Sequence, residues 1–391
     1  AMVMAMAGCG NTDNGSAATG TNAATESAAA SDSAASGSVF KIGGIGPTTG
    51  GAAVYGLAVQ HGAEIAVEEI NAAGGINGYQ IEFKFQDDEA DAEKSVNAYN
   101  ALKDWGAQII DGSTTSGACI AVTDKTKEDN MFQITPSGSA VECVQYDNNF
   151  RVCFSNPNQG LASAQYIGEN GLAEKIAVIY DSSDVYSSGI YEKFAKEAEN
   201  QPFEIVAAEA FTADNKTDFS VQLQKAKDAG ADMVFLPIYY QESALILTQA
   251  AAMGYAPKWF SCDGMDGILG GVDNFDVSLT EGVMLLTPFA ADATDDLTQS
   301  FVTKYKEKYG DTPNQFAADS YDAIYVIKAA IEKSGVTPDM SVSDICDGMK
   351  AAMTEITVDG LTGNGMTWTA DGEANKAPKA VVIENGAYKA M

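Results

Sequence analysis

Two hydrophobic patterns alternate along the sequence after residue 38. Short runs rich in Val, Ile and Phe, such as VFKIGGIG and QIEFKFQ, have the length and composition of strands. Longer segments between them, such as VYGLAVQHGAEIAVEEINAAGG, place apolar residues at helical spacing and end in glycines. Because strands alternate with helices, the pattern predicts parallel sheets covered by helices on both faces.

The alternation begins again near residue 159, which indicates a second unit of the same kind. A chain of 391 residues with 46% hydrophobic residues is long enough to form two cores. Three long helices are then predicted between residues 294 and 353, and strand-like segments with Asp-Gly and Asn-Gly turns end the chain. We therefore expect an α/β protein with two doubly wound parallel-sheet lobes.

The first 38 residues have a different composition. Residues 1–9, AMVMAMAGC, form an apolar run that ends in small residues before Cys9 and is too short to span a bilayer. This run resembles a signal-peptide remnant with a bacterial lipobox, which implies lipid attachment at Cys9. Residues 10–38 contain no aromatic residue, no Lys or Arg, and no apolar residue larger than alanine, so we expect a disordered tether.

Charge and rare residues exclude several classes of function. With 54 acidic and 23 basic residues the net charge is −31, which disfavours binding to nucleic acid or to an anionic membrane surface. The sequence has one histidine, His61, and no C-x-x-C pair, so we expect no metal site. It also lacks G-x-S-x-G and G-x-x-x-x-G-K-[ST], so we expect neither an enzyme nor a bound cofactor.

Two cysteines flank the turn-like segment VQYDNNFRV. Cys143 and Cys153 are candidates for a disulfide if their side chains face each other. Buried free thiols are the alternative for these and for the remaining cysteines.

Polar loops follow several predicted strands, where parallel sheets bind ligands. The segment Ser113 to Ala118 opens a helix, so its N–H groups and hydroxyls are suited to an anion such as a carboxylate. The segment Thr135 to Ser139 offers hydroxyl and carbonyl groups to an ammonium. Each loop could instead satisfy only its own backbone as a helix cap or a turn.

Three motifs in residues 46–88 carry a family resemblance. They are the turn GPTTGG, the helix end INAAGGING and the strand end QDD. Together they resemble the periplasmic leucine/isoleucine/valine-binding proteins, the solute receptors of amino-acid ABC importers. The resemblance implies a type I periplasmic-binding fold with a three-stranded hinge. Lobe one would then comprise residues 39–157 and 288–365, and lobe two residues 158–287 and 366–391.

The resemblance implies that two loops of lobe one bind the groups attached to the α-carbon of the ligand. The serine that binds the α-carboxylate matches Ser116, or Thr115 if the alignment shifts by one residue. In the next loop a backbone carbonyl matches Ser137 and a hydroxyl matches Ser139.

In lobe two the resemblance assigns aromatic groups and one acid. Tyr186 and either Tyr239 or Tyr240 would line the pocket, and Asp263 would pair with the ligand's ammonium. An aspartate that caps a short helix is the alternative for Asp263. Tyr55 and Phe316 are further candidates for the pocket walls.

The function expected from the sequence is that of an extracytoplasmic receptor tethered to the cell membrane as a lipoprotein. It would be a monomer that binds a free amino acid, branched-chain or otherwise apolar or aromatic, and delivers this amino acid to an ABC permease. The alternative is an amide or urea sensor of the same fold that regulates a partner.

Overall fold

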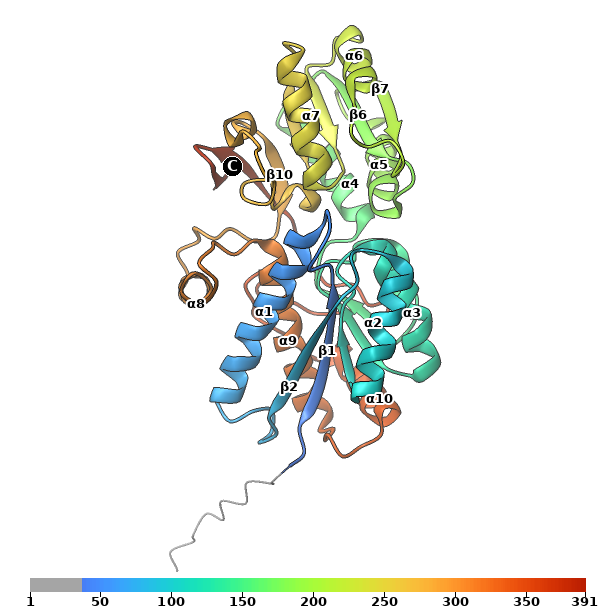
Figure 1. Ribbon diagram of the computed structural model, residues 1–391, viewed down its shortest axis with the longest axis vertical. Helices are drawn as coiled ribbons and strands as arrows, with labels where there is room; N and C mark the ends of the chain where they lie inside the picture. Colours follow the sequence, from blue (N-terminus) through green and yellow to red (C-terminus); the bar gives the residue numbers. More distant parts are fainter. Residues whose placement is uncertain (1–36) are drawn as a thin grey trace, which may run out of the picture. The chain divides into compact units, whose positions relative to one another are not determined.

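The computed structural model describes residues 37–391 (Figure 1). The predicted lipid attachment at Cys9 and nearly all of the predicted tether lie outside the described residues. None of the helices within residues 37–391 has both the length and the apolar character that a membrane crossing requires.

The first sheet has five parallel strands in the order β2-β1-β3-β4-β5. Its strands are β1 (Phe40–Gly46), β2 (Ile81–Asp87), β3 (Ile109–Asp111), β4 (Phe132–Thr135) and β5 (Asn149–Arg151).

The second sheet has seven strands in the order β12-β11-β10-β9-β8-β6-β7. Its parallel strands are β6 (Lys175–Asp181), β7 (Glu204–Phe211), β8 (Met233–Leu236), β9 (Lys258–Ser261) and β10 (Met284–Thr287). The strands β11 (Lys379–Glu384) and β12 (Ala387–Ala390) add an antiparallel hairpin at one edge. The expected fold of two parallel-dominated α/β lobes is thus confirmed.

Helices cover both sheets. They are α1 (Ala53–Ala72), α2 (Ala92–Trp105), α3 (Ser116–Asp129), α4 (Asn156–Glu169), α5 (Val185–Ala198), α6 (Ser220–Asp228), α7 (Tyr240–Ala252), α8 (Asp296–Tyr309), α9 (Gln315–Ser334) and α10 (Val342–Ala352). Short 3₁₀ helices follow β4 and β9; they are η1 (Val141–Val144) and η2 (Asp263–Met265).

Neighbouring side chains along a strand of the first sheet are buried on opposite faces of the sheet. Ile109 of β3 belongs to the core beneath α1 and α9, whereas Ile110 belongs to the core beneath α2 and α3. Figure 1 shows these two helix pairs on either side of β1 and β2. Because α1 and α9 pack so closely that a Cβ at Gly62 would collide with the carbonyl of Ala317, glycine is required at that position.

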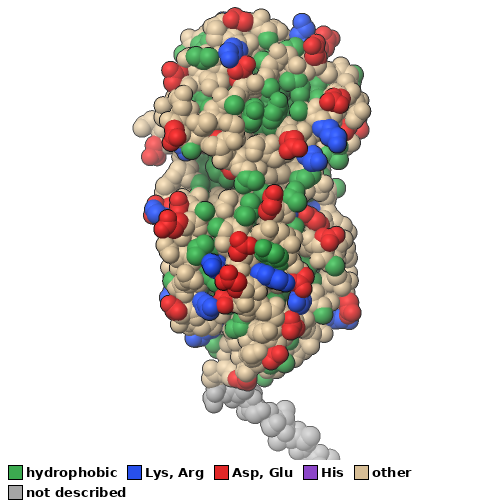
Figure 2. All heavy atoms as spheres, turned by 90° about the vertical axis from the view of Figure 1, so that its right-hand side faces the viewer, with side chains coloured by type: hydrophobic (Ala, Val, Ile, Leu, Met, Phe, Trp, Pro, Cys, Tyr) green, Lys and Arg blue, Asp and Glu red, His purple; other side chains and the backbone are tan. Residues whose placement is uncertain are grey.

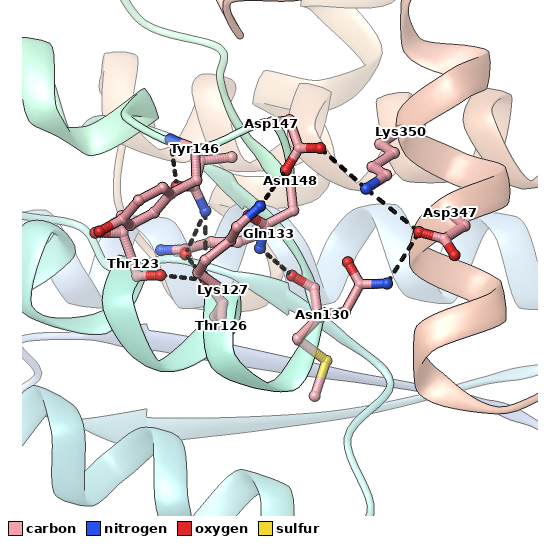
Figure 3. A network of polar contacts seen from close by, with 12 residues as sticks. Thr123, Thr126, Lys127, Asn130, Gln133, Tyr146, Asp147, Asn148, Asp347 and Lys350 are labelled. Atoms are coloured by element: carbon pink, nitrogen blue, oxygen red, sulfur yellow. Dashed lines mark hydrogen bonds and ion pairs between the residues drawn. The ribbon is translucent and has the colours of Figure 1, made fainter.

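Charged and amide side chains link α10 to the end of α3 and to the loop before β5 (Figure 3). Asn130, at the end of α3, donates to Asp347 Oδ1 over 2.9 Å. Asp147 accepts from Lys127 over 2.8 Å and from Lys350 over 3.1 Å. These contacts are partly exposed and contribute little energy each, whereas Ile345, Cys346 and Met349 bury the apolar face of α10 in the core.

Acidic side chains are spread over the surface with lysines among them. Figure 2 shows no single-sign patch on the visible face. Many of the lysines pair with carboxylates at the surface, for example Lys225 with Glu209 over 2.9 Å. On this face the negative charge is therefore interspersed with lysines.

The chain passes between the two sheets three times. It leaves the first sheet after β5, returns after β10, and reaches the second sheet again at β11. Before this last passage the indole of Trp368 donates to the carbonyl of Arg151 over 2.8 Å, so residues near 368 lie against β5. The exact lobe boundaries drawn from the sequence stay a prediction.

Candidate ligand-binding site

A cavity lies where loops after the strands of the first sheet meet loops after the strands of the second. About 20 Å³ of this cavity is open to the centre of a water-sized sphere. That is room for about one water molecule, so a larger ligand requires the lobes to move apart. The lining residues are Tyr55, Thr114, Thr115, Ser116, Ser137, Tyr186, Tyr239, Asp263, Gly264 and Phe316.

Eight of the nine residues that the sequence singled out line this one cavity. The ninth, Ser139, is fully buried behind it, and its hydroxyl has no hydrogen-bond partner among residues 37–391. Tyr239 lines the cavity. The alternative Tyr240 does not line the cavity, and its hydroxyl accepts a hydrogen bond from the N–H of Val54.

Ser116 joins the two polar loops of lobe one. Its hydroxyl oxygen accepts from the N–H of Ser139 over 3.2 Å and from the N–H of Ala140 over 3.1 Å. A serine hydroxyl has two acceptor positions and one donor, so its O–H stays available to donate to a ligand.

The start of α3 can bind an anion. Thr115 precedes the helix, yet its side chain makes no capping hydrogen bond, and its buried Oγ1 has no partner within residues 37–391. The first N–H groups of a helix also lack intrahelical partners and carry partial positive charge. Thr115 and Ser116 therefore both present donors to the cavity, from the same helix end.

The loop that contains Ser137 is held by its neighbours. Ser137 Oγ donates to the carbonyl of Thr114 over 2.6 Å. Thr135 Oγ1 donates to the carbonyl of Ser113 over 2.6 Å and accepts from the N–H of Gly138 over 2.8 Å. Because these bonds use the hydroxyl protons within the protein, the shape of both loops is set before any ligand arrives.

Arg151 supports the site and was not among the residues singled out from the sequence. Its buried guanidinium donates to the carbonyls of Gly138 and Ala140 over 2.8 and 3.0 Å, and lies 3.0 Å from Glu373 Oε1. Only arginine offers several donors in one rigid plane, which suits two carbonyls and a carboxylate at once. The signal was present, because Arg151 is the only arginine in the sequence.

Asp263 lies in η2, opposite the start of α3 and only 5% exposed. The hydroxyl of Tyr186 donates to Asp263 Oδ1 over 2.6 Å and accepts from the N–H of Gly264 over 2.9 Å. The residue before η2 is Cys262, and no side chain caps this helix, so the carboxylate faces Tyr186 instead of acting as a cap.

Burial raises the pKa of Asp263 from its ordinary value of 3.8 to about 6, and hydrogen bonds from Tyr186 and Gly264 offset part of this rise. Within residues 37–391, Asp263 forms no ion pair with a lysine or arginine, and none of the main influences on its pKa is a cation. The carboxylate is therefore a buried acid that lacks a cation.

Aromatic rings form the remaining walls and bring the lobes into contact. Tyr55 of α1 packs against Phe316 with ring centroids 4.4 Å apart, and against Tyr239 with centroids 5.3 Å apart. Its hydroxyl donates to the carbonyl of Gly264. Because Tyr55 lies on the first lobe and Gly264 on the second, the cleft is closed in this structure.

The disulfide considered between Cys143 and Cys153 is not formed. Both are buried free thiols. Cys143 Sγ lies 3.7 Å from the carbonyl of Ser116 and faces Cys119, since η1 turns its side chain toward α3 and away from β5.

Replacing Arg151 tests whether it holds the loop. Arg151→Met leaves two buried carbonyls and Glu373 without their donor, so we expect the free energy of unfolding in urea to fall by about 3 kcal/mol. Arg151→Lys keeps the charge but not the planar donors, and an intermediate loss is expected. The control Lys225→Met breaks a surface pair and should cost less than about 1 kcal/mol. A loss no larger than the control's would contradict this role.

The raised pKa of Asp263 predicts a pH dependence of stability in the absence of ligand. Between pH 4 and 6 the unfolded chain loses this proton before the folded protein does, so the contribution of Asp263 to stability falls as pH rises. Over that range the wild type should lose about 3 kcal/mol relative to Asp263→Asn, measured by urea unfolding. Parallel pH profiles for the two proteins would show that Asp263 is not desolvated in the folded state.

Comparison with known proteins agrees with the geometry. Residues 39–387 match the family model described as periplasmic binding protein. A Leu/Ile/Val-binding protein homolog of Brucella melitensis is 30% identical over 76% of this chain and 80% of its own length. The leucine-, isoleucine-, valine-, threonine- and alanine-binding protein of Pseudomonas aeruginosa is also 30% identical, over 75% of this chain and 78% of its own length.

Solved structures show the same fold. The branched-chain amino acid transporter substrate-binding protein LivJ of Streptococcus pneumoniae, in complex with isoleucine, has a TM-score of 0.81 and 29% identity, and the match covers 90% of this chain and 98% of that one. A Rhodopseudomonas palustris solute-binding protein in complex with benzoate has a TM-score of 0.78 at 20% identity, over 90% of this chain and 95% of that one. The resemblance seen in the sequence is thereby confirmed, and the chain belongs to the periplasmic binding protein family, whose members are solute receptors rather than enzymes.

Proposed function

We propose that the protein binds a free α-amino acid in its closed cleft and delivers it to an ABC importer. The observation that carries this proposal is Asp263, a buried carboxylate without a cation, which faces the donor-rich start of α3 across one cavity. The names of the relatives, which bind leucine, isoleucine and valine, support the same class of ligand.

An α-amino acid matches the cavity group by group. Its carboxylate would accept hydrogen bonds from Ser116, from Thr115 and from the N–H groups that open α3. Its ammonium would pair with Asp263. The side chain would then lie against the aromatic walls formed by Tyr55, Tyr239 and Phe316.

Other small solutes fit less well. The fold alone does not choose the ligand, since the same fold holds benzoate in a distant relative. An aromatic acid, urea or a simple amide carries no positive charge and would leave Asp263 unpaired in a closed cleft. Leaving a charge in that state costs several kcal/mol. The amide or urea sensor is therefore the less favoured function.

We also propose that Cys9 is lipidated and that residues 10–38 tether a monomeric receptor to the outer face of the membrane. The composition of this segment supports the proposal, and the family is extracytoplasmic. The mass of the mature N-terminal peptide should include a diacylglyceryl group on Cys9. An unmodified cysteine in protein from the native membrane would overturn the proposed anchor.

A panel of solutes tests the ligand class. We expect L-isoleucine, L-leucine or another of the twenty amino acids to raise the unfolding temperature, because ligand at 100 times Kd adds about 2.7 kcal/mol of stability. The panel should also contain benzoate, urea and acetamide. Stabilisation by these uncharged or anionic solutes alone would contradict the proposal.

Asp263→Asn should abolish the shift caused by the amino acid while the variant remains folded. The control Asp276→Asn changes an exposed aspartate that caps the 3₁₀ helix Val277–Thr280 and does not line the cavity, and this variant should bind as the wild type does because asparagine also caps a helix. Equal affinity of wild type and Asp263→Asn would remove Asp263 from the site.

A further inference from the structure

Two thiols that ligand binding does not use lie against each other in lobe one. Cys119 is in the first turn of α3 and Cys143 in η1, and both are buried. With Ala140 they form a small core cluster of their own. Cys143 is the main influence that lowers the pKa of the Cys119 thiol. They are 24 positions apart in the sequence, yet they face each other as a pair.

The pair lies directly behind the two polar loops of the cavity. Cys143 Sγ contacts the carbonyl of Ser116 over 3.7 Å. On the other side, a Cβ at Gly138 would lie 3.1 Å from Cys119 Sγ, so the loop that carries Ser137 passes over this thiol.

A residue of the second lobe packs against Cys119 and Cys143. Val185, the first residue of α5, packs against the cluster of Cys119, Ala140 and Cys143. Since α5 belongs to the lobe of the second sheet, Val185 leaves this position when the lobes separate. Access to the thiols therefore depends on whether the cleft is open or closed.

The surroundings act differently on the two thiols. The pKa of Cys119 is lowered, whereas burial holds the pKa of Cys143 well above its ordinary value although Arg151 opposes this, so Cys119 is the thiol suited to the first attack. Cys346 in α10 provides a contrast, because it is equally buried but lies in a helix remote from the cleft.

We propose that Cys119 and Cys143 are a redox modification site that an external disulfide oxidises when the cleft is open, and that a ligand protects by closing it. The protection, though not the oxidation, rests on the proposed amino-acid function.

The reaction is a pair of thiol–disulfide exchanges. The Cys119 thiolate attacks a sulfur of the external disulfide, which forms a mixed disulfide and releases one thiolate. The Cys143 thiolate then attacks Cys119 Sγ, which forms the Cys119–Cys143 bond and releases the second thiolate. The two protein thiols lose two electrons, the external disulfide gains them, and the two protons pass to the released thiolates.

Oxidation without ligand tests the site itself. The full-length protein with Cys9→Ser is incubated with oxidised glutathione, the free thiols are alkylated after unfolding, and peptides are mapped by mass spectrometry. We expect a Cys119–Cys143 linked peptide and an alkylated Cys346. In Cys143→Ser the reaction should stop at a glutathione adduct on Cys119. If Cys119 and Cys143 of the native protein stay unlinked, or link no faster than Cys346 reacts, the proposal is wrong.

Oxidation in the presence of ligand tests whether closure of the cleft protects the two thiols. L-isoleucine, or whichever amino acid stabilises the protein in the thermal panel, is added at 100 times its Kd. The unliganded fraction then falls to about one per cent, so formation of the disulfide should slow about 100-fold while reaction at Cys346 does not change. An unchanged rate in protein that shows the thermal shift would overturn this protection. If no amino acid shifts the unfolding temperature, the proposed function fails and the oxidation result still stands by itself.

Discussion

The closed cleft buries the carboxylate of Asp263 without a cation, and the rest of the site is best understood from this constraint. Tyr186 and Gly264 supply hydrogen bonds, but these do not neutralise the charge, and burial still raises the pKa to about 6. Contacts between the lobes, such as the bond from Tyr55 to Gly264, favour closure. A positively charged ligand group removes the opposing cost, so that closure and binding support each other.

The opposite wall is built in advance. Ser116, Thr135 and Ser137 connect the two loops of lobe one with hydrogen bonds, and Arg151 holds the carbonyls of the second loop from behind. Arg151 also contacts the segment that leads into the last passage between the lobes, because its N–H donates to the carbonyl of Gly372 over 3.0 Å. Lobe one thus offers a preformed anion site, and the second lobe adds the acid that completes it. Preformed donors lose little freedom on binding, which favours affinity.

The fold and most of the cavity lining could be predicted from the sequence, because local signals specify them. Strand and helix patterns predicted the alternation, and the loops after strands marked where a ligand could bind. The family resemblance then assigned Ser116, Ser137 and Asp263 within those loops. Long-range features were harder. Arg151 stands in FRV, an ordinary edge-strand sequence, and its partners are carbonyls that carry no sequence signal. To choose between Tyr239 and Tyr240, the residue at which α7 begins had to be known. The direction of the Cys143 side chain is set by η1, which places it beside Cys119 and not beside Cys153.

The most direct test of the central claim compares two ligands that differ only in the ammonium group. Calorimetric titration would be carried out with L-isoleucine, or the amino acid that the thermal panel identifies, and with the same carboxylic acid lacking the amino group. If Asp263 pairs with the ammonium, the analogue should bind about 30-fold or more weakly, since removing one partner of a buried charged pair costs 2 kcal/mol or more. Equal affinities for the two compounds would contradict the account.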